Sequence, residues 1–161
     1  MADPRKKLQP GDTAPDFELS DADGKPVRLS RLTAQGKRVV LYFYPMDNTP
    51  NCTAEACRFS EEAPHFAEKG AVVIGVSMNS TASHARFRDQ RRLALTLLSD
   101  PEGKVIEAYG AFRTGILGIG RTALAIIRST FLIDEKGIVR KALYGVKVKG
   151  HAEEMLGALG K

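Results

Sequence analysis

Six consecutive apolar residues, 39–44, followed at once by Pro45, constrain the fold of this chain more than any other stretch. The run is rich in β-branched and aromatic side chains, which is typical of a central strand that is buried on both faces. Proline has no amide donor, so the predicted strand ends at Pro45. The sequence therefore predicts a buried central strand that leads into a short polar turn.

A helix is predicted directly after this turn. Thr49 suits the N-cap and Pro50 suits the first helical position. Apolar residues then recur at helical spacing, which predicts a stripe that faces the sheet. Pro64 lies inside this pattern and is expected to bend or locally break the helix. The stripe consists of Ala56, Phe59, Ala63, Phe66 and Ala67.

The two cysteines of the chain both fall near the start of this predicted helix. Cys52 lies on the apolar stripe, and Cys57 lies about 140° further round the helix. Backbone N–H groups and the helix dipole stabilise a thiolate at a helix N-terminus, and the thiolate is the reactive form of cysteine. The alternative is that both cysteines are small buried hydrophobic residues. The strand, the proline, the capped turn and the second cysteine favour a reactive Cys52.

These residues also carry a resemblance to a known family. The motif Pro45-x-x-x-Thr49-x-x-Cys52 resembles the active-site motif of the peroxiredoxins. Residues 47–59 resemble the bacterioferritin comigratory protein, or peroxiredoxin Q, subfamily. Further matching pieces follow in the family's order and cover nearly the whole chain. They are residues 11–17, 75–77, 83–84, 97–103, 128–134 and 146–154.

The resemblance implies a thiol peroxidase that acts on hydrogen peroxide and organic hydroperoxides without a cofactor or metal. Cys52 would attack the peroxide and become a sulfenic acid. Cys57 would resolve this product as an intramolecular disulfide. A thioredoxin-type reductant, either thioredoxin or glutaredoxin, would then reopen the disulfide by exchange.

Four further residues complete the site that the resemblance implies. The Thr49 hydroxyl would hydrogen-bond the thiolate or the peroxide, and Pro45 would shield the site from water. Arg128 would hold the thiolate and the peroxide oxygens with its fork of donors; without the resemblance it would be assigned to the surface. Glu55 would orient Arg128, or alternatively stabilise the helix dipole from the first turn.

Two other functions stay open from the residues alone. A thioredoxin-like disulfide oxidoreductase would want Cys-x-x-Cys, whereas this chain has Cys-x-x-x-x-Cys. A non-enzymatic metal-binding protein would use Cys52, Cys57 and a histidine, but the spacing to His65 exceeds the usual zinc pattern. The remaining histidines, His84 and His151, are expected at the surface or as capping residues.

The other segments predict an α/β thioredoxin-like sandwich, in which helices flank a central mixed β-sheet that has an N-terminal β-hairpin. The chain is expected to form a single domain, 1–161, with residues 1–10 as a loosely held tail. Strands are expected at residues 16–19, 27–29, 39–44, 71–77, 95–98, 129–133 and 138–143. Helices are expected from 50 to a stop at 69–70, from a cap at 79 or 80 to 91, and at 105–109 and 151–159, with a helical turn at 29–32.

Residues 111–127 depart from the family pattern, because they are unusually apolar and contain three glycines. Residues 123–127 are expected to begin the following strand or an adjoining extension. The alternative is a mobile apolar loop that lines the pocket or meets a partner chain.

Composition excludes several classes of function. The net charge of +5 is scattered over short clusters without interleaved aromatic residues, so nucleic-acid binding is not expected. The N-terminal residues lack the apolar core of a secretory signal, and no apolar run is long enough to cross a membrane. Two cysteines do not make a disulfide-dense secreted scaffold. A cytoplasmic monomer is expected, with a weak dimer as the alternative.

Overall fold

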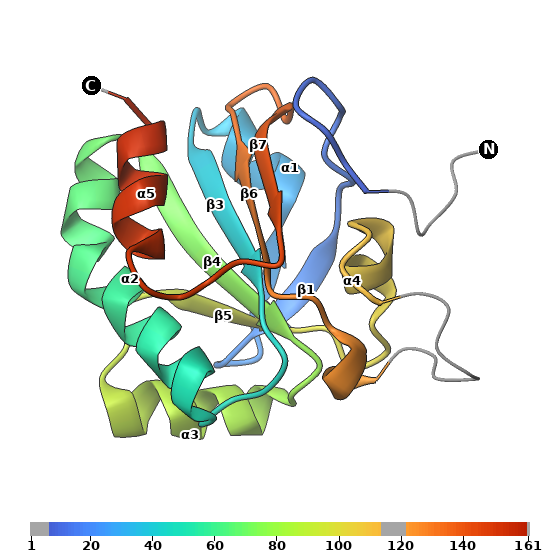
Figure 1. Cartoon of the computed structure of the whole chain (residues 1–161), viewed down its shortest axis with the longest axis vertical. Coiled ribbons are helices and arrows are strands. Elements are labelled where there is room, and N and C mark those ends of the chain that lie inside the picture. Colours follow the sequence, from blue (N-terminus) through green and yellow to red (C-terminus); the bar gives the residue numbers. More distant parts are fainter. Residues whose placement is uncertain (1–6, 114–121, 161) are drawn as a thin grey trace.

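Seven strands form one mixed sheet in the computed structural model, which describes residues 7–113 and 122–160 (Figure 1). The strand order is β2-β1-β5-β4-β3-β6-β7. The three inner strands β5, β4 and β3 are parallel, whereas β6, β7 and the β1–β2 hairpin pair antiparallel. The strands are β1 (Glu18–Asp21), β2 (Pro26–Arg28), β3 (Arg38–Phe43), β4 (Ala71–Ser77), β5 (Thr96–Ser99), β6 (Ser129–Ile133) and β7 (Val139–Tyr144).

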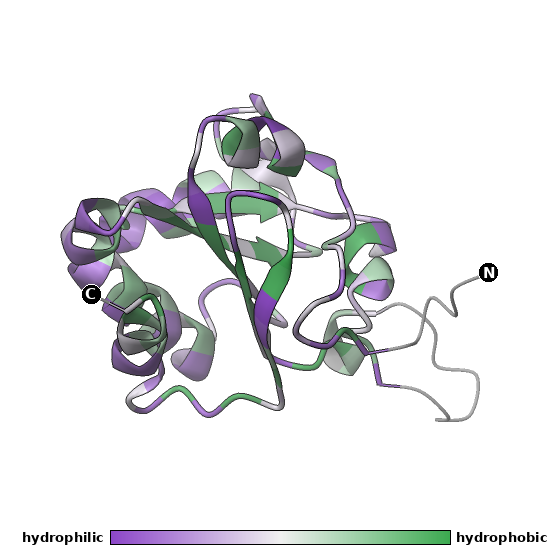
Figure 2. Ribbon diagram, turned by 90° about the horizontal axis from the view of Figure 1, so that it is seen from above, coloured by the Kyte–Doolittle hydropathy of each residue, from purple (hydrophilic) through white to green (hydrophobic). Residues whose placement is uncertain are grey.

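Helices cover both faces of this sheet, with α2, α3 and α5 on one side and α1 and α4 on the other (Figure 1). Their polar sides face outward, and the apolar strands lie between the layers (Figure 2). The helices are α1 (Leu29–Ala34), α2 (Pro50–Glu68), α3 (Thr81–Arg91), α4 (Lys104–Ala108) and α5 (His151–Ala158), and Ala123–Ala125 forms a 3-10 helix. None of the helices in the described residues combines the length and apolar character needed to traverse a bilayer.

Strand β3 separates two apolar cores, because successive side chains of a strand point to opposite faces. Leu41 and Phe43 pack against α1 and α4. Val40 and Tyr42 pack against α2, α3 and α5, in the same cluster as Cys52. The run of six apolar residues is thus explained by a central strand that is buried on both sides.

The structure confirms the predicted fold and most of the predicted elements. Strands β4 and β6 occupy the predicted residues, and the hairpin, the helical turn and the terminal helix are present. Of the two expected caps for α3, Ser80 is the one used, since its side chain accepts from the Ser83 N–H. The chain reverses after α2 at Gly70, which has a positive φ of 70°.

Two expectations about local structure need correction. Of the expected bend or break at Pro64, the break is wrong, because helix α2 runs through Pro64 and keeps Phe59 and Phe66 on either side of it buried. Residues 123–127 do not begin β6. Ala123–Ala125 form the 3-10 helix, and Ile126 then pairs with Phe112 in an isolated bridge. The alternative of a mobile loop falls on residues 114–121, which lie outside the described residues.

The end of the expected N-terminal tail contacts the sheet. The Leu8 N–H donates to the Tyr144 hydroxyl at 2.8 Å, and Lys7 Nζ lies 5.1 Å from the centre of the Tyr144 ring. Residues 7 and 8 therefore lie against β7, on the side of the sheet that α1 and α4 cover.

The expectation that His84 and His151 lie at the surface or cap helices is wrong, because both side chains are buried and the N-caps of α3 and α5 are Ser80 and Gly150. Burial is possible because each ring finds two polar partners. His151 Nε2 lies 2.7 Å from Thr130 Oγ1, and Nδ1 lies 3.2 Å from Glu154 Oε1. Burial lowers the pKa of His151, although the Glu154 carboxylate opposes that shift. This ring joins the start of α5 to β6.

His84 on α3 fixes the turn between β3 and α2. Its Nδ1 lies 2.8 Å from Asp47 Oδ2, and its Nε2 lies 2.9 Å from the Leu98 carbonyl. Each ring nitrogen thus has an oxygen partner, the Asp47 carboxylate on one side and the Leu98 carbonyl on the other. The hydroxyls of Tyr44 and Ser83 also donate to the Asp47 carboxylate, at 2.6 and 2.8 Å.

The Asp47 carboxylate is held in its ionised form by these partners. Burial alone would raise its pKa, but the hydrogen bond and charge of His84, with the two hydroxyls, outweigh burial and lower it. The Asp47 N–H donates to Asn79 Oδ1 at 2.9 Å. The turn that precedes α2 is thereby tied to three other segments of the chain.

The variant His84→Ala is expected to lower the free energy of unfolding by about 3–5 kcal/mol, because it leaves the buried Asp47 carboxylate unpaired. Equilibrium urea denaturation measures this change. His65→Ala is the matched control, since His65 is exposed on α2 and its loss should cost no more than about 0.5 kcal/mol. Equal small effects in the two variants would show that the Asp47–His84 pair adds no net stability.

Candidate active site

Cys52 lies in the first turn of α2, immediately after the fixed turn. The backbone of Thr49 is extended, and α2 begins at Pro50, as predicted. Asn48 takes a positive φ of 63°, a conformation that asparagine tolerates better than most residues, and this lets the chain turn sharply into the helix. The Cys52 side chain is only 2% exposed and carries a free thiol.

Arg128, the residue just before β6, reaches Cys52 from the neighbouring segment. Its Nη2 donates to Cys52 Sγ at 3.2 Å, and its Nη1 donates to Glu55 Oε1 at 2.5 Å. The antiparallel register places Ser129 opposite Phe43, so β6 starts where β3 ends and α2 begins. The sheet therefore brings Arg128 to Cys52 and Glu55, although more than 70 residues of sequence separate it from each of them.

The charges of this cluster depend on one another. Burial lowers the pKa of Arg128, but the charge of Glu55 and the contact with Cys52 outweigh burial, so the pKa is raised and the guanidinium stays charged. Glu55 is 1% exposed, and burial raises its pKa to about 7 against the opposing effect of Arg128. Near neutral pH the carboxyl is therefore divided between its protonated and ionised forms.

Tyr42 on β3 faces the same cluster. Burial raises the pKa of its hydroxyl well above the usual value, and the charges of Glu55 and Cys52 raise it further, so it stays protonated. Its ring stacks on Phe59 at a centroid distance of 4.9 Å. On the other side, a Cβ at Gly75 would lie 2.7 Å from a ring carbon of Tyr42, so the ring requires a glycine there.

Three buried polar atoms of the described residues lack a hydrogen-bond partner: Tyr42 Oη, Thr53 Oγ1 and Glu55 Oε2. Buried polar groups are normally paired, so unpaired ones need an explanation. Two of the three belong to the cluster around Cys52. This concentration is typical of a site that completes its hydrogen bonds only when a ligand or water binds.

The structure does not bring every expected site residue to the thiol. The Thr49 hydroxyl donates to the Met46 carbonyl at 3.0 Å and makes no capping bond to its helix. Pro45 is half-buried at the start of the turn. Cys57 is half-buried further along α2, and its thiol is free.

The residues that the sequence analysis missed are Tyr42, Asp47 and His84. Tyr42 lies within the apolar run and gives no separate signal. Asp47 and His84 both fall in segments that match the family, but neither residue reveals a partner 37 positions away.

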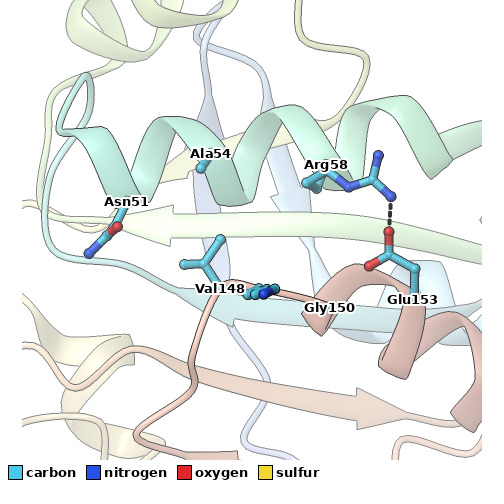
Figure 3. Close-up of a pocket in the computed structure, with 7 residues that line it drawn as sticks. Asn51, Ala54, Arg58, Val148, Gly150 and Glu153 are labelled. Atoms are coloured by element: carbon cyan, nitrogen blue, oxygen red, sulfur yellow. Dashed lines mark ion pairs between the residues drawn. The ribbon is translucent and has the colours of Figure 1, made fainter.

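A groove of about 540 Å³ runs between the first turns of α2 and the segment before α5 (Figure 3). Arg58 on α2 forms an ion pair with Glu153 on α5 at one end, and Asn51, next to Cys52 in sequence, lies at the other. The groove therefore follows the flank of the helix that carries both cysteines. Its lining residues are Asn51, Ala54, Arg58, Val148, Lys149, Gly150 and Glu153.

Metal binding finds no support in the part of the chain that the structure describes. No group of three or more His, Cys, Asp or Glu side chains there could hold an ion. His65, the histidine nearest to the cysteines in sequence, lies 2.9 Å from Glu62 on the exposed side of α2.

Comparison with known proteins shows which family this chain belongs to. The AhpC/TSA family matches residues 10–142. The putative peroxiredoxin bcp of Helicobacter pylori is 46% identical over 154 residues, which cover 96% of this chain and 99% of the relative. Peroxiredoxin Bcp of Bacillus subtilis is 43% identical over 152 residues, covering 94% and 95%.

Solved structures give the same result. Peroxidoxin BcpB from Mycobacterium tuberculosis superposes with a TM-score of 0.85 at 39% identity, covering 94% of this chain and 96% of that one. The bacterioferritin comigratory protein of Xanthomonas campestris, studied for its alkyl peroxide reduction activity, gives a TM-score of 0.81 at 37% identity over 89% of each chain. The chain therefore belongs to the AhpC/TSA family as a peroxiredoxin of the Bcp, or peroxiredoxin Q, type, and is a thiol-dependent peroxidase.

Proposed function

We propose that Cys52 is the thiol that reduces the peroxide and that Cys57 resolves the product as an intramolecular disulfide. A thioredoxin-type protein, thioredoxin or glutaredoxin, then reduces the disulfide. The observation that carries this assignment is the 3.2 Å contact from Arg128 Nη2 to Cys52 Sγ in the first turn of α2. A guanidinium and a helix N-terminus both favour the thiolate, which is the nucleophile.

The first step of the reaction uses the groups around Cys52. The thiolate attacks the terminal oxygen of hydrogen peroxide or an organic hydroperoxide, the S–O bond forms and the O–O bond breaks. Sulfur is oxidised to sulfenic acid while the peroxide is reduced to water or an alcohol. The guanidinium of Arg128 stabilises the oxygens in the transition state. The Thr49 hydroxyl joins it after turning away from Met46, and Pro45 limits access of water.

The remaining steps fit a single chain in a reducing compartment. Cys57 is the only other cysteine of the sequence, so it is the only internal thiol that can attack the sulfenic acid. The groups proposed for both steps come from one chain, which favours action as a monomer. Recycling by a thioredoxin-type protein requires a reducing pool such as the cytoplasm supplies.

The two cysteines are expected to behave differently when they are replaced. Cys52→Ser should abolish peroxide turnover, because Cys52 is the cysteine that accepts the hydrogen bond from Arg128. Cys57→Ser should react with one equivalent of peroxide and stop as a sulfenic acid or a mixed disulfide. Peroxide consumption with a thioredoxin system, together with mass spectrometry of the product, measures both outcomes. Substantial turnover by Cys52→Ser would reverse the assignment.

Replacing Arg128 should slow the peroxide step by about 10²-fold or more, as the loss of other preorganised donors does. Stopped-flow kinetics of Arg128→Ala and Arg128→Lys with excess peroxide measure the rate constant. Arg140→Ala is the control, because Arg140 is an exposed arginine on β7 that pairs with Asp134. A near-normal rate constant for Arg128→Ala would remove Arg128 from the mechanism.

The disulfide requires α2 to unwind. Positions 52 and 57 of one α-helix have Cα atoms roughly 8–9 Å apart on different faces, whereas a disulfide needs about 4.4–6.8 Å. Both residues lie within the continuous helix Pro50–Glu68. We therefore expect residues 49–59 to unfold locally on oxidation and to refold on reduction.

Amide hydrogen exchange measures this opening. Exchange across residues 49–59 should accelerate sharply in the disulfide form, while exchange in β4, which lies in the middle of the sheet, stays unchanged. Equal protection of residues 49–59 in both redox states, with the 52–57 bond confirmed by mass spectrometry, would contradict the geometric argument.

A further inference from the structure

One half-buried guanidinium, that of Arg128, contacts two acidic groups in this molecule. Arg128 contacts Cys52 Sγ with one nitrogen and Glu55 Oε1 with the other, and both acids are almost fully buried. If the thiol and the carboxyl were both ionised, the site would hold two negative charges against one positive charge. Two interacting acids in such a site titrate as a pair, and the charge on one favours the proton on the other.

The second carboxyl oxygen of Glu55 has room for that proton. Glu55 Oε2 is buried and has no hydrogen-bond partner among the described residues, whereas Oε1 is occupied by Arg128. A buried carboxylate oxygen without a donor is costly, but a protonated oxygen can instead donate to an incoming group.

We propose that Glu55 is a further catalytic residue, which gives its proton to the departing oxygen of the peroxide. This inference rests on the proposed role of Cys52 as the attacking thiol. The thiolate takes the terminal OH of the hydroperoxide and becomes a neutral sulfenic acid, and the sulfur loses two electrons to the O–O bond. The departing alkoxide or hydroxide takes the proton of the carboxyl, leaving an alcohol or water and an ionised Glu55.

The step keeps the charge around Arg128 constant. Before it, the guanidinium faces a thiolate and a neutral carboxyl; after it, the guanidinium faces a neutral sulfenic acid and a carboxylate. No net charge enters or leaves the buried site, so little reorganisation of the surroundings is needed. A site that lost its anion would instead leave the half-buried Arg128 without a counter-charge, which is costly.

The other titratable groups near this cluster do not supply the proton. Tyr42 faces it from β3, and burial raises the pKa of its hydroxyl well above the usual range. Asp47, in the turn before α2, has a lowered pKa and is ionised. His151 of α5 has a lowered pKa, and Arg128 contributes to that shift, so it is neutral near pH 7 and its ring is bonded to Thr130.

The pH range in which Glu55 can give up its proton depends on the pKa of its carboxyl. Burial, opposed by Arg128, sets the pKa of Glu55 at about 7. A negative charge on a neighbouring thiolate favours the protonated form of a carboxyl. Under the proposal the carboxyl therefore holds its proton more firmly while the thiolate is present and gives it up more readily once the thiolate has been consumed. At about pH 6 the carboxyl recovers a proton from solvent after the reaction.

Counting protons tests the proposal directly. The protein carries Cys57→Ser so that the reaction stops at the sulfenic acid, and one equivalent of hydrogen peroxide is added in weak buffer with a pH indicator. At about pH 8 this protein should take up well under one proton per sulfenic acid formed, rising towards about one at pH 6. With Glu55→Gln added, uptake should be about one proton at both values, and the peroxide step should slow by about 10²-fold.

Glu61→Gln is the matched control, because Glu61 is an exposed acid on the same helix that pairs with Arg58. It should change neither the proton count nor the rate. The same low uptake at pH 8 with and without Glu55 would overturn the role of Glu55, while the role of Cys52 would stand as long as its sulfenic acid forms. Turnover by Cys52→Ser would overturn the proposed function instead.

A measurement on the protein with Glu55 intact covers the case in which Glu55→Gln fails to fold. Exposed carboxyls are ionised at about pH 8, so the infrared C=O band of a protonated carboxylic acid reports a buried one. Oxidation of the Cys57→Ser protein should remove this band as the sulfenic acid forms. An unchanged band, or no band before oxidation, would overturn the proposal.

Discussion

The bond from Arg128 to the first turn of α2 is the interaction on which the site depends. It is made possible by the pairing of β3 with β6, because this register puts the residue before β6 beside the end of β3. A buried thiolate and a buried carboxyl would each be expensive alone. One guanidinium, on the residue next to the start of β6, lowers the cost of burying both groups and contacts them both.

The turn before α2 is held from the other side. Asp47 is bonded to Tyr44, Ser83, His84 and Asn79, so the chain up to residue 47 is anchored to α3 and to the segments around it. Beyond residue 49 the helix is anchored by apolar packing and by Arg128. The hydrogen bonds of Asp47 thus hold the turn directly before the helical segment that must unwind for the disulfide to form. The unwinding can start after residue 49 without disturbing the sheet.

The sequence predicts the fold well because the fold rests on local patterns. Buried strands such as β4 are continuous apolar runs, and the helix of Cys52 begins at a proline after a threonine. Contacts between distant residues leave no such pattern. Arg128 came from the family resemblance alone, since 76 residues separate it from Cys52. His84 was assigned to the surface because a single histidine does not disclose a buried carboxylate that pairs with it.

The chemistry itself can release the segment that must unwind. A thiolate accepts a strong, charge-assisted hydrogen bond from Arg128, and this bond holds the first turn of α2 against β6. Once sulfur carries oxygen as a neutral sulfenic acid, the bond loses the negative charge of its acceptor and weakens. The guanidinium remains paired with Glu55, so the loss falls on the cysteine alone. In the proposed mechanism the first turn of α2 is therefore most stable before peroxide binds. The free energy needed to unwind it, so that Cys52 can reach Cys57, falls only after the peroxide has been reduced.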